Sequence, residues 1–86
     1  MLSGTTKSGF AYEIRDEQLN NFELVEVLAE VDKNTLLLPK LVEMLLGKEQ
    51  KAKLLDHLRT ADGIVPLDLI SVEVMEIFQS GHAKNS

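Results

Sequence analysis

One segment that is apolar almost all the way round a helix constrains this fold the most. Residues 35–46 contain only three side chains with polar character: Thr35, Lys40 and Glu43. A helix of this kind is either central in a core or partly covered by another chain. Because a chain of 86 residues has little material to wrap a central helix, we expect this segment to be divided between the monomer core and an interface.

The ends of this helix are marked by proline, glycine and capping residues. Pro39 is tolerated only in a first turn, where its missing N–H would have no partner. The helix is therefore predicted to begin just before it, with Asn34 or Thr35 as the cap. Gly47 is typical of the left-handed residue that closes a helix.

The remaining periodicity predicts a mainly α fold, with about four helices in one small domain and a short extended N-terminal segment. The expected elements are an extended piece over 9–14 and helices over 16–32, 35–46, 48–60 and 66–79. Polar flexible tails are expected at 1–8 and 82–86, on either side of a single helical domain over 9–81, with Ser80 and Gly81 ending the last helix.

Two N-terminal patterns bear on partners. The apolar side chains within 9–14 alternate at the strand period: Phe10, Tyr12 and Ile14. Because an isolated strand needs a partner edge, this strand is expected either to pair with another copy in an oligomer or to lie on the helices. In the following helix, which begins near Asp16 or Asn21, a narrow acidic stripe lies beside a wide apolar arc. The stripe consists of Glu23, Glu26 and Glu30.

Charge and composition exclude several classes of protein. Fourteen acidic residues against nine Lys and Arg give a net charge of −5, which disfavours binding to a nucleic-acid backbone. Without cysteine there is no disulfide framework and no zinc-finger pattern. No window has the length of uncharged apolar sequence that a membrane-spanning helix needs, and the N-terminus is not a secretory signal, so we expect a cytoplasmic protein.

No pattern predicts catalysis, a cofactor or a metal site. The segment around Asp62 and Gly63 resembles part of a calcium loop, but placing Gly63 at its sixth position puts leucines at the first and twelfth. His57 and His82 have no second ligand at metal-binding spacing, and His57 is expected to be exposed. The acidic stripe faces outward, whereas acid–base catalysis needs carboxyl groups in contrasting environments. We therefore predict a protein that is not an enzyme.

What remains is more apolar surface than a four-helix monomer can easily hide. Exposed apolar patches mark protein–protein contacts, so oligomerisation or a hydrophobic client is favoured. The predicted interaction residues are Leu37, Leu38, Leu41 and Leu45 in the apolar helix, and Leu69 and Val72 in the last helix.

Several of these patterns together resemble a known family. The run L-L-L-P-K-L-V-E-M-L-L-G within 34–47, the segment 58–66 and the opening G-F-A-Y-E-I at 9–14 are similar to small tail assembly chaperones. These proteins serve long-tailed phages and prophages of Gram-positive bacteria. The resemblance covers residues 9 to 86 and rests on apolar, glycine and proline positions.

The resemblance implies a helical, non-enzymatic protein of the host cytoplasm that is absent from the mature virion. Such a chaperone coats the aggregation-prone tape measure protein and helps to recruit the major tail protein, which also implies a homo-oligomer. The alternative from another class is a small dimeric helical regulator, either antitoxin-like or an adaptor module. Open-ended self-association would favour the coat, and one fixed stoichiometry would favour the regulator.

Overall fold

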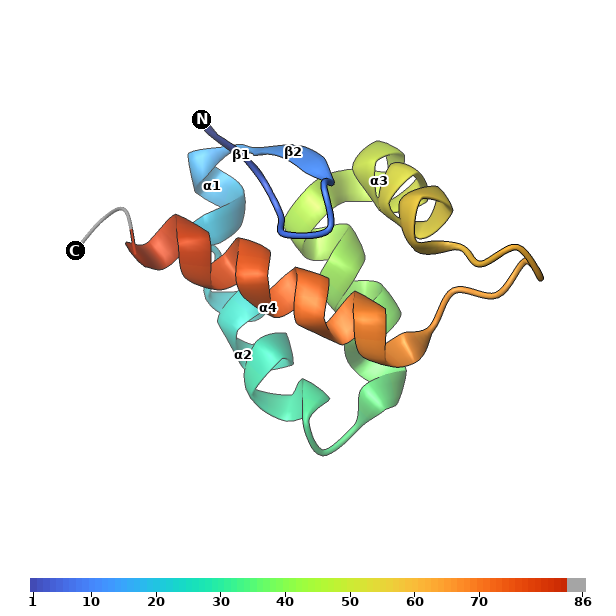
Figure 1. The fold of residues 1–86 in the computed structure, drawn as a ribbon. Coiled ribbons are helices and arrows are strands. Elements are labelled where there is room, and N and C mark those ends of the chain that lie inside the picture. Colours follow the sequence, from blue (N-terminus) through green and yellow to red (C-terminus); the bar gives the residue numbers. More distant parts are fainter. Residues whose placement is uncertain (84–86) are drawn as a thin grey trace.

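The described part of the chain folds into a small, mainly helical domain in which a two-stranded sheet precedes four α-helices and one short 3₁₀ helix (Figure 1). The computed structural model describes residues 1–83, with side chains through Ser80. The elements are β1 (Leu2–Thr5), β2 (Ala11–Ile14), α1 (Asp16–Leu19), α2 (Phe22–Val31), the 3₁₀ helix η1 (Thr35–Leu37), α3 (Leu38–Leu58) and α4 (Leu67–Ala83). The predicted fold class is confirmed.

The partner edge for the predicted strand comes from the chain's own N-terminus. β1 pairs antiparallel with β2, with Gly4 opposite Tyr12, so residues 1–8 are not the loose tail that their composition predicted. The connecting turn closes where the Thr6 N–H donates to the Phe10 carbonyl at 2.9 Å. Gly9 supplies the positive φ of 95° that this turn requires.

The other edge of β2 is closed by a side chain of α3. The Glu13 N–H donates to Oε1 of Gln50 at 2.7 Å, and Nε2 of Gln50 donates to the carbonyl oxygens of Glu13 and Leu46. The amide thus takes the place of a neighbouring strand, which fixes the hairpin to the middle of α3.

Close packing across the hairpin predicts that a Gly4→Ala variant is destabilised. An added Cβ would lie 2.6 Å from the Tyr12 hydroxyl oxygen, and the Tyr12 ring is buried and cannot move aside. We expect urea denaturation to show a loss of about 1–3 kcal/mol in unfolding free energy. Ser3→Ala, at the exposed neighbouring position, should stay within about 0.5 kcal/mol of wild type. Equal stability of Gly4→Ala and wild type would contradict this packing.

The first predicted helix is divided in two. α1 ends at Leu19, and α2 begins after Asn21, whose side chain accepts a hydrogen bond from the Glu23 N–H at 3.0 Å. Both of the starting points expected from the sequence are therefore used. An asparagine cap forces non-helical backbone at its own position, so α1 and α2 cannot be continuous.

The predicted helices over 35–46 and 48–60 correspond to the two halves of α3, which are separated at Gly47 as expected. Asn34 caps η1 as expected, by accepting from the Leu36 N–H, and Pro39 lies in the first turn of α3. Gly47 breaks the helical path with φ 81° and ψ 165°. The half of α3 before this break is apolar, and the half after it is more polar.

The end of the last helix differs from the prediction. α4 begins at Leu67, one residue after the predicted start, and it continues through Ser80 and Gly81 to Ala83. A glycine inside a helix costs only about 1 kcal/mol, so it does not by itself end one. The first two residues of the predicted C-terminal tail over 82–86 are therefore helical, and the other three lie outside the described residues.

The hydrophobic core is centred on the first half of α3. The elements that pack against α3 include α2, α4 and β2. α4 runs across one side of the molecule, where it contacts α1 and α3 (Figure 1). The buried apolar residues are Phe10, Tyr12, Ile14, Leu24, Leu38, Leu41, Val42, Leu45, Leu46, Leu54, Leu58, Ile70, Val74 and Ile77.

Candidate interaction surfaces

The structure separates the six predicted interaction residues into buried, half-buried and exposed ones. Leu38, Leu41 and Leu45 are at most 4% exposed and belong to the core, so they cannot contact a partner in this conformation. The apolar side chains of α3 are covered mainly by the chain itself, because α2, α4 and β2 all pack against this helix. Leu37 is half-buried. The other two predicted residues, on α4, are exposed.

These two residues form part of an apolar surface along α4. Leu69 is 43% exposed and Val72 is 60% exposed, and Met75 extends the surface by another turn. Asp68 is exposed and Glu76 is half-buried on the same helix. We call Leu69, Val72 and Met75 the α4 surface. The two acidic residues beside it, Asp68 and Glu76, favour solubility and leave the apolar side chains accessible to a partner.

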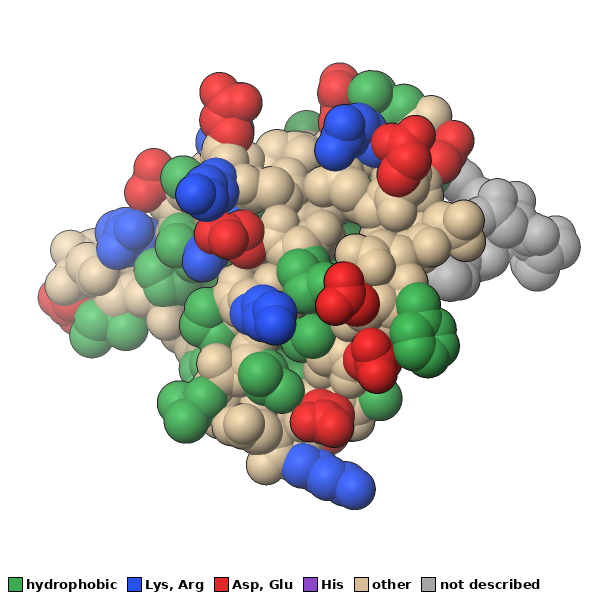
Figure 2. Space-filling model, turned by 180° about the vertical axis from the view of Figure 1, so that it is seen from behind, with side chains coloured by type: hydrophobic (Ala, Val, Ile, Leu, Met, Phe, Trp, Pro, Cys, Tyr) green, Lys and Arg blue, Asp and Glu red, His purple; other side chains and the backbone are tan. Residues whose placement is uncertain are grey.

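A second apolar surface lies on α2. Phe22 and Val25 are exposed by 73% and 42%, and Ala29 is also exposed. These three residues, which we call the α2 stripe, have the spacing i, i+3, i+7 and so share one face of the helix. The acidic stripe of Glu23, Glu26 and Glu30 lies beside it, and all three of its residues are exposed. Figure 2 shows acidic side chains beside hydrophobic ones at its lower right, where α2 lies.

None of the α2 stripe residues is among the six predicted interaction residues, although all three lie in the wide apolar arc expected on this helix. The acidic stripe fixes the outward side of α2, and Phe22 and Val25 lie close to that side on a helical wheel. Four further large apolar residues are exposed outside the two surfaces among the described residues: Met1, Leu36, Ile64 and Leu67. Single exposed residues of this kind are common in monomeric proteins.

A polar cluster fixes the hairpin turn to the helices. Glu73 is 4% exposed, and its Oε1 accepts hydrogen bonds from the hydroxyls of Thr6 at 2.8 Å and Ser8 at 2.9 Å. Nε2 of His57 lies 3.0 Å from the Ser8 carbonyl oxygen, and the His57 ring is 5.7 Å from that of Phe10. As predicted, His57 is exposed.

This cluster contains serine, histidine and glutamate, but its geometry differs from that of a catalytic triad. A triad needs the carboxylate to bind the histidine and the serine hydroxyl to donate to the same ring. Here Nε2 of His57 lies 3.1 Å from the Ser8 hydroxyl oxygen and 3.0 Å from the Ser8 carbonyl oxygen, but the Glu73 carboxylate accepts from the serine hydroxyl instead of binding the histidine. The contacts therefore hold the turn against α3 and α4.

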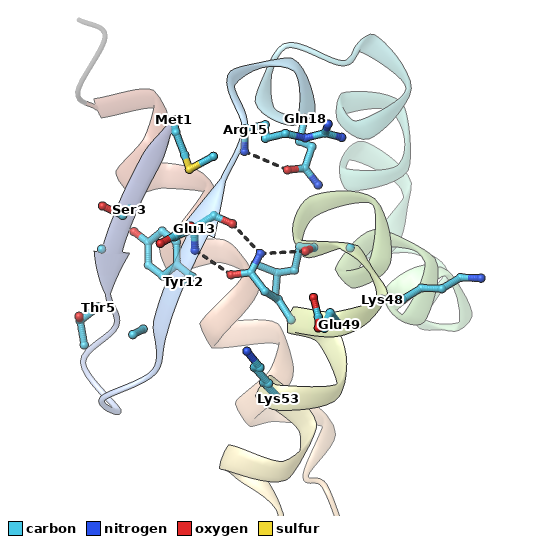
Figure 3. Close-up of a pocket in the computed structure, with 15 residues that line it drawn as sticks. Met1, Ser3, Thr5, Tyr12, Glu13, Arg15, Gln18, Lys48, Glu49 and Lys53 are labelled. Carbon is cyan, nitrogen blue, oxygen red and sulfur yellow. Dashed lines mark hydrogen bonds between the residues drawn. The ribbon is translucent and has the colours of Figure 1, made fainter.

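A cleft of about 840 Å³ lies between the hairpin and the kink of α3 (Figure 3). Cationic side chains from Arg15, Lys48 and Lys53 line it together with the carboxylates of Glu13 and Glu49. Because side chains of both signs line the cleft, neither an anion nor a cation meets a uniformly complementary wall.

Among the described residues, no group of three or more His, Asp or Glu side chains is placed to hold a metal ion. None of the helices in the described part of the chain has the length and apolar character needed to cross a membrane. No protein-family model, curated protein or solved structure matches this chain.

Proposed function

We propose that this protein is a tail assembly chaperone that coats the tape measure protein during the assembly of long phage tails. The observation that carries the proposal is the pair of exposed apolar surfaces, on α2 and α4, each with acidic residues beside it. The sequence resemblance supplies the client. In this role the protein works without catalysis in the host cytoplasm, helps to recruit the major tail protein and leaves before the virion is complete.

The mechanism depends on many weak contacts. Apolar stripes on a long helical client would aggregate if they remained in water, and helix-on-helix contacts with the α2 and α4 surfaces would cover them. Copies bound side by side on one client gain from multivalency, so each contact can be weak. The expected homo-oligomer then forms along the client, and the acidic residues keep the coated complex soluble.

Co-expression with a tape measure protein tests this function. Wild-type chaperone should keep most of the client in the supernatant after lysis, in complexes that contain several chaperone copies. The double variant Leu69→Asp, Val72→Asp should lose this effect because it places carboxylates in the α4 surface. Circular dichroism should show unchanged helicity for this variant, since both positions are exposed.

A matched control adds the same charge elsewhere. Ala52→Asp with Ala61→Asp changes two exposed residues outside both apolar surfaces, and should protect the client as wild type does. An insoluble client in the presence of wild-type chaperone, or full protection by the Leu69→Asp, Val72→Asp variant, would overturn the proposal. A fixed chaperone dimer bound to one target in sedimentation would favour the regulator instead.

A further inference from the structure

The α2 stripe has the form of one half of a helix–helix contact. Phe22 is the most exposed aromatic side chain among the described residues, at 73%, and Val25 lies one turn further along the same face. The opposite side of α2 packs into the core through Leu24, which is fully buried. The helix is therefore held firmly from behind and presents a preformed apolar face, so little ordering is needed when a partner binds.

The acidic stripe beside this face has no partner within the described part of the chain. Glu23, Glu26 and Glu30 form none of the ion pairs found there, which involve other acidic residues: Asp16, Glu17, Glu43 and Asp56. Three like charges on successive turns repel one another. A partner that brings cations to this side of α2 would relieve the repulsion and add attraction.

A second copy of this chain does not offer a matching surface. Its most basic segment, residues 40–59, turns Leu54 and Leu58 into its own core. The α4 surface carries Asp68 and Glu76 and would meet the acidic stripe with charges of the same sign. Leu36 is exposed, but it is a single side chain on a three-residue turn and provides no apolar seam.

We propose that the α2 stripe and the acidic stripe together form a docking surface for an amphipathic helix whose apolar seam is flanked by Lys or Arg. The seam covers Phe22 and Val25, and the flanking cations face the three glutamates. This inference rests on the proposed function, because it states which chemistry in the client the chaperone recognises. It also predicts that binding weakens as salt is added, since exposed charge pairs are screened.

Two designed peptides test the surface without a phage protein. Each is a dye-labelled helix of about 18 residues, long enough to be helical in water, with the same Leu/Ala seam. One peptide carries Lys along one flank of the seam, and the other carries Glu at those positions. Fluorescence anisotropy should show that wild-type protein binds the Lys peptide at least about tenfold more tightly than the Glu peptide.

Charge reversal should exchange this preference. The triple variant Glu23→Lys, Glu26→Lys, Glu30→Lys should weaken binding of the Lys peptide about tenfold and strengthen binding of the Glu peptide. The control is Glu17→Lys, Glu49→Lys, Asp62→Lys, which makes the same change in net charge at exposed sites away from α2 and should keep the wild-type preference. Phe22→Ala should weaken both peptides, because it removes the apolar anchor.

Each of three results would overturn the inference: equal binding of the two peptides by wild-type protein, the same exchange of preference in the control variant, or unchanged binding by Phe22→Ala. A wild-type dimer in sedimentation that dissociates on reversal of Glu23, Glu26 and Glu30 would assign the surface to a second copy instead. Failure here with a client still protected in co-expression would reject this surface and leave the chaperone function standing. An aggregated client in co-expression, together with the expected binding of the two peptides, would reject the chaperone function alone.

Discussion

A Leu45→Glu variant is expected to lose its cooperative fold. Leu45 is fully buried at the centre of α3, where the carboxylate would have no partner. Loss of the leucine packing costs about 2–5 kcal/mol, and a buried unpaired charge adds several more. A chain of 86 residues has a total stability of roughly 4–13 kcal/mol. Circular dichroism should therefore show reduced helicity and no sharp thermal transition.

The control is the same substitution nine residues earlier in the same leucine-rich segment. Leu36 is 85% exposed in η1, so Leu36→Glu should melt within a few degrees of wild type. A folded Leu45→Glu variant would show that this side chain does not lie in the core. Together the two variants separate the core side of the segment from its exposed side.

The sequence identified the apolar helix correctly but not what covers it. Periodicity shows that residues 35–46 are apolar on nearly all sides, and it cannot show which neighbours are available. Besides α2 and α4, a hairpin packs against α3. This hairpin depends on β1, whose Leu-Ser-Gly-Thr sequence has little strand propensity and resembles a loose tail. Its strand forms because β2 provides an edge and Glu73 fixes the turn, and both effects are tertiary.

The candidate surfaces were predictable where helical spacing alone decides exposure, and not where exposure depends on neighbouring elements. Leu69 and Val72 lie off the main apolar face of the last helix, so their exposure follows from helical spacing alone, and the structure agrees. The role of Leu38, Leu41 and Leu45 depended on the surroundings of α3, and their interface assignment is replaced by a core assignment. Helical spacing placed the α2 stripe beside the acidic stripe, but the exposed fraction of its side chains depends on the direction in which α2 packs.

The polar cluster predicts that Glu73→Ala strongly destabilises the fold. The substitution leaves the Thr6 and Ser8 hydroxyls without their carboxylate acceptor, and the Thr6 side chain is buried. Hydrogen bonds to a charged group contribute more than neutral ones, so we expect urea denaturation to show a loss of about 2–4 kcal/mol. Glu73→Gln keeps one carbonyl acceptor and should lose less.

Glu76→Ala provides the matched control for this effect. Its carboxylate accepts from the Lys7 N–H at 2.9 Å in an exposed bond, one turn further along the same helix face, so water can replace it at little cost. A double-mutant cycle between Glu73→Ala and Thr6→Val then isolates the buried hydrogen bond. A coupling energy of about 1–2 kcal/mol is expected for residues in direct contact. Additive effects would show that Glu73 stabilises α4 alone, and the hairpin would then owe its position to Gln50 and its apolar face.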